Sequence, residues 1–205
     1  ASRWISRLHA IEIENDDEER FRNTSLRQIN HEHIFVIPFA ESIPVDLDAI
    51  TSGLEACRRE LVCNDSVRRT AAELGNQYLH SLGGDKTQRR LLHGDYYPGS
   101  FLRQRSMDVD LADKFFVIDP EFCFVGPPEF DLGVLLAHAV FCGRAPDDAI
   151  EEIASHYNDS AQLDQGLWVG FAAIEILRRL LGVAQLPIDV DLVQKREWIE
   201  LARVW

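Results

Sequence analysis

Two short apolar runs in the middle of the chain constrain its fold most, because each one ends in a carboxylate. The run LLHGD reaches Asp95, and the run FFVID reaches Asp119. An unpaired carboxylate in a low-dielectric environment is strongly destabilising, so a charge at such a strand end indicates that the fold uses it. The apolar runs that flank the polar segment MDVDLADK predict a β-hairpin.

Helical periodicity dominates the rest of the chain. Apolar residues recur at spacings of three and four after Asp46 and after Asp65, and Asp is a favourable N-cap at both positions. The pair Gly83-Gly84 is expected to end the second of these helices. Further helices are predicted around Trp4 at the start of the chain and from Leu132 onward.

Two segments allow more than one interpretation. HIFVIPF, residues 33–39, is either a strand or a buried extended segment, and IEIENDDEERFRN is a solvated loop or helix end. With 46% hydrophobic residues, the chain can bury one sizeable core. The predicted class is therefore α+β, mostly helical, with a small β-hairpin, in a single domain over residues 1–205.

Composition restricts the partners. The chain has 21 basic and 34 acidic side chains and a formal net charge of -13, which argues against nucleic acid and favours a small molecule. Its four cysteines form no C-x-x-C pair and lie in apolar surroundings, so buried reduced thiols and a cytoplasmic location are expected. The chain has no apolar run of about 18 residues, so no membrane partner is expected.

The acidic residues near the strand ends predict a cation site. Asp95, Asp119 and Glu121 could be brought together by the fold, and Mg²⁺ is the usual occupant of such an oxygen-rich site. The cation would then recruit phosphates. Taken singly, Asp119 or Glu121 could equally be a turn or cap residue.

Several motifs together resemble a known family. HGDYYPGS, IDPEF and GPPEFDLG, with the arginine pair in ILRRLLGVA, are similar to the catalytic signature of the aminoglycoside phosphotransferase and choline kinase superfamily. Within it, the resemblance is greatest to the 5-methylthioribose kinases. It implies small-molecule kinase activity with ATP and Mg²⁺, on a protein-kinase-like fold.

The resemblance also implies that half of that fold is absent here. Kinases of this kind bind ATP between two lobes, with a glycine-rich loop and a strand Lys in the N-terminal lobe. No Gly precedes Gly53, and Lys is scarce. The chain is therefore expected to be a C-terminal catalytic lobe without its ATP-binding lobe.

Catalytic roles follow from the same resemblance. Asp95 and Ser100 keep the spacing of the Asp and Asn in the kinase catalytic loop, so Asp95 would accept the proton from the acceptor hydroxyl or orient it. Asp131 would anchor the loop, cap the following helix, or both. His93, grouped with them, is expected mainly to pack and hydrogen-bond the loop, where Gly94 permits a tight turn.

Ligand contacts are implied for the remaining residues. Asp119 and Glu121 would hold Mg²⁺ against the nucleotide, with Ser100 as a weaker cofactor contact. Arg178 and Arg179 would contact sugar hydroxyls, although two cations near a helix C-terminus are also favoured by its dipole. Tyr96 and Tyr97 are expected to line the mouth of the site, or to serve as core or turn residues.

The sequence thus predicts transfer of the γ-phosphate of Mg-ATP to a sugar hydroxyl, with a homodimer as a further expectation. One alternative is a kinase for aminoglycosides, choline or homoserine; the arginine pair argues against the cationic acceptors among them. The other alternative is a non-catalytic, pseudokinase-like lobe that binds a partner chain through an exposed apolar patch.

Overall fold

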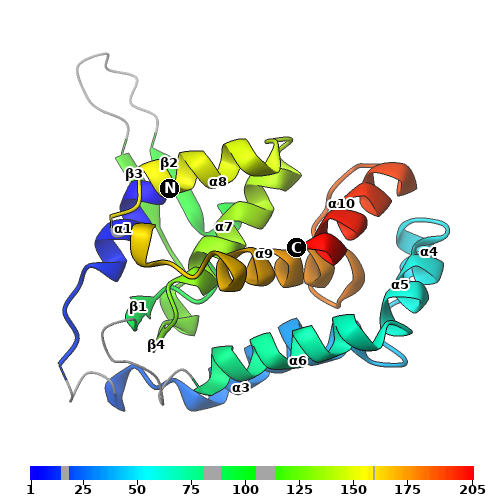
Figure 1. The fold of residues 1–205 in the computed structure, drawn as a ribbon, viewed down its shortest axis with the longest axis horizontal. Helices are drawn as coiled ribbons and strands as arrows, with labels where there is room; N and C mark the ends of the chain where they lie inside the picture. Colours follow the sequence, from blue (N-terminus) through cyan, green and yellow to red (C-terminus); the bar gives the residue numbers. More distant parts are fainter. Residues whose placement is uncertain (15–18, 81–88, 105–113, 159) are drawn as a thin grey trace.

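Helices make up most of the protein, and two small β-sheets lie together at one end of it (Figure 1). The computed structural model describes residues 1–14, 19–80, 89–104, 114–158 and 160–205. The Gly83-Gly84 pair, most of the polar segment between the hairpin strands and part of the charged stretch near residue 16 lie outside the described residues. The predicted α+β class, mostly helical, is confirmed.

The helices follow the predicted periodicity closely. Asp46, Asp164 and Asp191 each cap a helix by accepting a hydrogen bond from a backbone N–H in its first turn. The bounds are α1 (Ser2–His9), α3 (Thr24–His31), α4 (Leu47–Ile50), α5 (Leu54–Val62), α6 (Asp65–His80), α7 (Glu129–Phe141), α8 (Pro146–Ser155), α9 (Gln165–Leu181) and α10 (Leu192–Val204).

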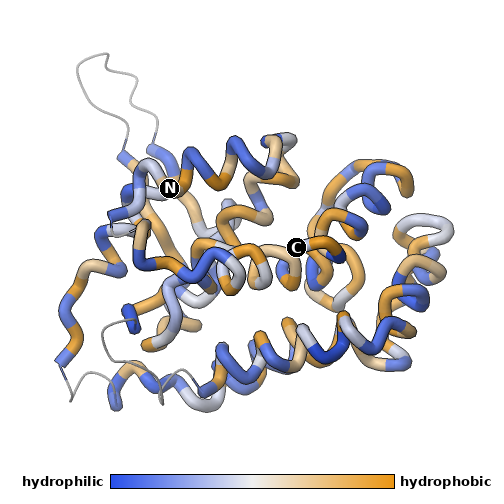
Figure 2. The backbone as a smooth tube through the Cα atoms, in the orientation of Figure 1, coloured by the Kyte–Doolittle hydropathy of each residue, from blue (hydrophilic) through white to orange (hydrophobic). Residues whose placement is uncertain are grey.

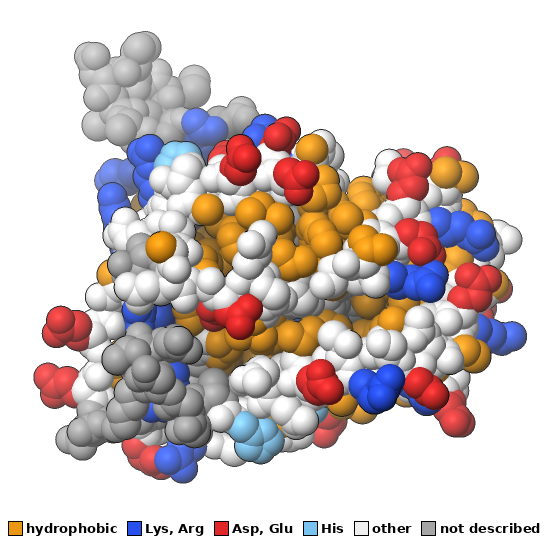
Figure 3. Space-filling model, in the orientation of Figure 1, with side chains coloured by type: hydrophobic (Ala, Val, Ile, Leu, Met, Phe, Trp, Pro, Cys, Tyr) orange, Lys and Arg blue, Asp and Glu red, His pale blue; other side chains and the backbone are white. Residues whose placement is uncertain are grey.

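Helices α7 and α9 form the centre of the core. Nearly every residue of α9 from Trp168 to Leu181 is buried, and hydrophobic colour predominates along it in Figure 2, whereas polar and apolar residues alternate along α6. A Cβ atom on Gly133 of α7 would collide with Phe171 of α9, so this glycine permits the close approach of the two helices. Figure 3 shows hydrophobic side chains across the middle of one face, with most charged side chains around them.

Each small sheet consists of two antiparallel strands. Strand β1 (Arg90–Leu92) pairs with β4 (Phe124–Gly126), and β2 (Phe101–Gln104) pairs with β3 (Lys114–Val117). The second pair is the predicted hairpin, which is confirmed. The loop from β1 to β2 and the turn from β3 to β4 both run between the two sheets, so the acidic motifs become spatial neighbours.

The segment 33–39 is helical, and its prediction as a strand or extended segment was wrong. A π-helix (Glu32–Val36) continues α3, and a 3₁₀ turn (Ile37–Phe39) follows it. The segment packs against α6 and α9, where Ile34 and Phe35 are buried. Periodicity alone does not separate a short buried helix from a buried strand, and here tertiary packing decides.

Three further expectations need correction. Asp65, expected as an N-cap, is the first residue of α6, and Asn64 Oδ1 accepts from the backbone N–H groups of Ser66 and Val67 instead. The helix predicted after Asp46 is interrupted at Gly53, whose φ of 89° is left-handed, so α4 and α5 are separate. The four cysteines are free, as expected, but Cys63 and Cys142 are exposed rather than buried. Among the residues that the structure describes, no helix is both long and apolar enough to cross a membrane.

Candidate active site

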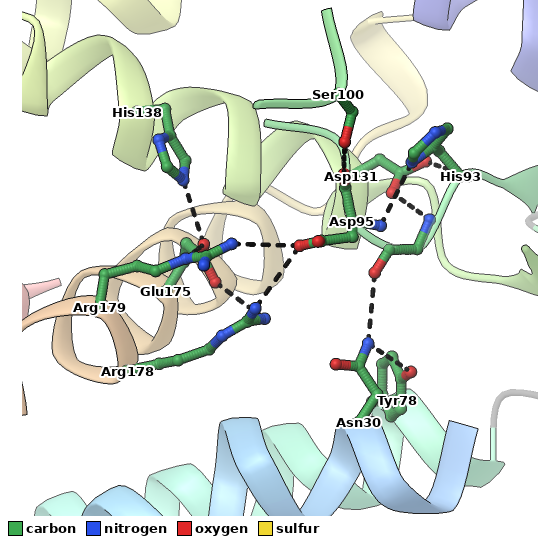
Figure 4. Close-up of polar contacts among 11 residues, drawn as sticks. Asn30, Tyr78, His93, Asp95, Ser100, Asp131, His138, Glu175, Arg178 and Arg179 are labelled. Atoms are coloured by element: carbon green, nitrogen blue, oxygen red, sulfur yellow. Dashed lines mark hydrogen bonds and ion pairs between the residues drawn. The ribbon is translucent and has the colours of Figure 1, made fainter. Parts of the chain in front are cut away.

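The loop after β1 is anchored by Asp131 in the first turn of α7. Asp131 Oδ2 accepts a hydrogen bond of 2.7 Å from the backbone N–H of His93, and Oδ1 accepts one of 3.0 Å from that of Gly94 (Figure 4). The side chain is completely buried. The N-cap of α7 is Pro128, so the structure supports the loop-anchoring alternative for Asp131 and not the capping alternative.

The imidazole of His9 also contacts the carboxylate of Asp131. His9 of α1 places its Nε2 3.2 Å from Asp131 Oδ2 and its Nδ1 3.0 Å from the hydroxyl of Tyr157. Sequence reasoning missed His9, because its partners are distant in the chain and no local pattern marks them. The anchor therefore links the start of the chain to the loop.

His93 connects the two acidic motifs. Its Nε2 lies 3.0 Å from the carbonyl oxygen of Ile118, to which it donates, and its Nδ1 accepts from the N–H of Asp95 at 3.4 Å. Both ring nitrogens are therefore engaged with backbone, and the ring is buried. This geometry supports the packing role and leaves neither nitrogen free for proton transfer.

The hydroxyl of Ser100 is used within the loop itself. Its hydroxyl donates to the carbonyl oxygen of Asp95 at 3.0 Å, and the side chain is buried. The expected cofactor contact is therefore not supported, because the hydroxyl closes the loop on itself.

Gly94 allows the loop to pass directly against the turn after β3. Its φ is 84°, and a Cβ atom there would collide with the carbonyl oxygen of Phe122.

Gly143 has nearly the same φ, 82°, with open space around its Cβ position. We expect Gly143→Ala to cost about 1–2 kcal/mol of unfolding free energy from backbone strain alone.

Gly94→Ala adds the collision to the same strain. It should therefore cost at least ~1 kcal/mol more than Gly143→Ala. Urea unfolding followed by tryptophan fluorescence measures both variants. Equal losses in the two variants would show that the contact with Phe122 is not tight.

Asp95 meets both arginines of α9. Its Oδ1 lies 3.2 Å from Nη2 of Arg179 and 3.5 Å from Nη2 of Arg178. Burial raises the pKa of Asp95 above its ordinary value, although the Arg178 guanidinium opposes this shift. A carboxylate with a raised pKa is a better proton acceptor than an ordinary aspartate.

Glu175, one helical turn before the arginines, lies between them. Its Oε1 accepts from Nε of Arg179 at 2.7 Å, and its Oε2 forms an ion pair of 3.3 Å with Nη1 of Arg178. His138 Nε2 of α7 lies 3.2 Å from the same Oε1. Burial disfavours the carboxylate, but the two arginines outweigh it and hold the pKa of Glu175 well below its usual range.

The two tyrosines of the loop have different environments. Tyr96 is 0% exposed, stacks on Trp4, and donates its hydroxyl to the carbonyl oxygen of Ala1 at 2.9 Å. Its expected contact with substrate is therefore not supported; it is a core residue. The ring of Tyr97 lies 4.5 Å from Cζ of Arg179, in a cation–π contact beside the arginine pair.

Asp119 and Glu121 remain candidates for a metal. Both are exposed: Glu121 lies in the 3₁₀ turn Pro120–Phe122, and Asp119 is the N-cap residue before it, with a left-handed φ of 61°. The described residues contain no group of three or more potential metal ligands, so the expected cluster of three carboxylates is wrong: Asp95 is engaged by arginines instead. Two carboxylates are still sufficient for Mg²⁺, which commonly completes its shell with phosphate and water.

Two asparagines that sequence reasoning missed connect α3 to both motifs. Asn23 Nδ2 donates to the carbonyl oxygens of Glu121 at 2.7 Å and Cys123 at 3.0 Å. Asn30 Nδ2 donates to the carbonyl oxygen of Gly94 at 3.3 Å. Nothing in their local sequence marks these residues, whereas Glu175 could have been found from its i,i+3 and i,i+4 spacing to the arginines.

Comparisons with known proteins identify a family and similar chains. A family model described as "Phosphotransferase enzyme family" matches residues 5–167. A methylthioribose kinase from Exiguobacterium sibiricum is 30% identical, with 84% of this chain and 48% of the relative covered. Methylthioribose kinases from Geobacillus kaustophilus and Bacillus cereus strain AH187 are 27% and 25% identical, with 90% and 88% of this chain covered. The chain spans about half the length of these relatives.

Proposed function

Because the chain belongs to the phosphotransferase enzyme family, we propose that it is the C-terminal catalytic lobe of a small-molecule kinase. The reaction proposed is transfer of the γ-phosphate of Mg-ATP to a sugar hydroxyl, most like that of methylthioribose kinase. The observation that carries this proposal is the partly buried Asp95, held in a loop anchored by Asp131 and facing two arginines. The free cysteines are compatible with the proposed cytoplasmic location.

Asp95 is proposed as the catalytic residue. It accepts the hydrogen bond of the acceptor hydroxyl and takes its proton as the new oxygen–phosphorus bond forms and ADP leaves. The raised pKa of Asp95 favours this transfer. Most of the rate would come from positioning, since phosphoryl transfer requires little covalent help from the protein.

Asp119 and Glu121 are proposed to hold Mg²⁺. Their exposed carboxylates share one short turn, and Asn23 fixes the backbone of that turn through two carbonyl oxygens. When bound, Mg²⁺ neutralises the charge of the nucleotide phosphates. The two residues fit this task better than Ser100, whose hydroxyl is already used within the loop.

A neutral, hydroxyl-rich acceptor fits the charges of the site. The two guanidiniums of Arg178 and Arg179 are balanced by the carboxylates of Asp95 and Glu175. Nε and Nη1 of Arg178 are buried and have no hydrogen-bond partner among the described residues, which leaves unsatisfied donors beside Asp95. A cationic aminoglycoside or choline would have to approach both arginines, which is unfavourable.

The test is ADP release from Mg-ATP by the product of the complete reading frame. We expect turnover with 5-methylthioribose and little with choline, homoserine or an aminoglycoside. Turnover restricted to a cationic acceptor would overturn the assignment of a sugar as the acceptor and would leave the proposed kinase activity standing. No turnover with any of these acceptors would overturn the kinase proposal in favour of a non-catalytic binding lobe, and measuring the mass in solution would then test for a dimer.

A further inference from the structure

The arginine pair contacts two carboxylates unequally. Arg179 approaches Glu175 to 2.7 Å but Asp95 only to 3.2 Å, and Arg178 lies 3.3 Å from Glu175 and 3.5 Å from Asp95. A charge-assisted N–H···O bond is normally about 2.7–2.9 Å long, so only the bond between Arg179 and Glu175 has full strength. Arg179 is therefore held mainly by Glu175, whereas Arg178 makes longer ion pairs with both carboxylates and lies slightly nearer to Glu175.

Glu175 is itself fixed from the opposite side. The ring of His138 lies 5.3 Å from that of Tyr97 and 5.6 Å from that of Phe141, which restricts its orientation. In that orientation its Nε2 lies 3.2 Å from Glu175 Oε1, and it must carry the proton to donate there (Figure 4). The carboxylate, only 2% exposed, thus has three cationic or donor groups around it.

Removal of the Glu175 charge would change what the arginines can bind. Two buried guanidiniums on adjacent residues require a counter-charge, and Asp95 would be the remaining carboxylate in contact with them. Arginine pairs with a carboxylate most favourably in the two-bond, forked geometry. An Asp95 engaged in this way would have its oxygens occupied and could not receive the acceptor hydroxyl.

We propose that Glu175, oriented by His138, is a positioning residue that draws both arginines away from Asp95 and so keeps Asp95 accessible to the acceptor hydroxyl. The inference rests on the proposed function for its catalytic meaning. Its structural part, the division of the arginines between two carboxylates, is independent of which acceptor is used.

The decisive variant is Glu175→Gln, which keeps the size of the side chain and removes its charge. In the product of the complete reading frame, we expect kcat to fall and the KM for the acceptor to rise, each by about 10-fold to 100-fold, because small displacements at a reacting centre have effects of this size. The KM for ATP should change less than about twofold, since the arginines do not contact the proposed metal turn. A loss of folded enzyme would instead lower the apparent kcat and leave both KM values unchanged.

Glu129→Gln is the matched control. Glu129 is another buried glutamate, on α7, and its carboxylate accepts the N–H of Asp164 at 3.0 Å, away from the arginines. The Glu129→Gln variant should leave the KM for the acceptor unchanged. If Glu175→Gln retains the kcat and acceptor KM of the parent, or if Glu129→Gln reproduces its effects, the proposal is wrong.

Two further measurements separate this inference from the proposed function and from misfolding. A crystal structure of Glu175→Gln should show the guanidinium of Arg179 closer to Asp95 than 3.2 Å, whether or not the protein turns over. An unchanged distance would overturn the inference even in an active kinase. If Glu175→Gln fails to fold, His138→Phe takes its place, because it preserves the ring contacts and removes the donor to Glu175. His138→Phe should show the same kinetic pattern. His138→Gln should partly reverse that pattern.

Discussion

Replacing Asp95 with Asn should lower kcat by about 1,000-fold, within the range found for loss of a general base. The amide has almost the same shape but accepts no proton. Its oxygen would accept from the guanidinium of Arg179, now 3.2 Å from the carboxylate, which leaves the NH₂ group in place of the other carboxylate oxygen. The measurement is ADP release, with the acceptor that the wild type uses best. The fold should be retained, because burial of the Asp95 carboxylate is unfavourable in itself.

Asp191→Asn is the control for this chemical change. Asp191 caps α10 by accepting the N–H of Gln194 at 2.9 Å, and Asn is an equally good N-cap. The control should keep the kcat of the wild type. Should Asp95→Asn retain more than about a tenth of that rate, Asp95 would not be the proton acceptor, because general-base catalysis contributes at least 100-fold.

The second large effect is expected for Asp131→Asn. One of the two carboxylate oxygens becomes an NH₂ group, which would face either the N–H of Gly94 or the pair of donors from His93 and His9. Leaving buried donors unpaired costs about 1–3 kcal/mol each, so we expect a loss of about 2–4 kcal/mol in unfolding free energy. Urea unfolding measures it, and kcat should fall as well because the loop that carries Asp95 loses its anchor.

Asp164→Asn provides the comparison for stability. Asp164 caps α9 through the N–H of Leu167 at 3.0 Å, and its exchange for Asn should change the unfolding free energy by less than about 0.5 kcal/mol. A similarly small change in Asp131→Asn would mean that the loop is held by other contacts, such as the bond from Asn30 to the carbonyl of Gly94.

Local patterns were sufficient for most helices and for the hairpin. Spacings of three and four mark α5, α6 and α9, and a capping Asp precedes several helices, because these features depend on residues within one or two turns. The same holds for the loop around Asp95: its motif lies within a few residues, so its position after a short strand was predictable. The segment 33–39 was not, because only its packing against α6 and α9 distinguishes a buried helix from a strand.

The sequence by itself determined most of the helices, the hairpin, the family and the identity of the charged residues, since each is encoded in short-range spacing. The tertiary structure decided which charges meet: it paired Asp95 with Arg178 and Arg179, separated it from Asp119 and Glu121, and buried Tyr96. His9, Asn23 and His138 became functional candidates only there. Such contacts join residues far apart in the chain, and their energies depend on burial and distance, which no local pattern specifies.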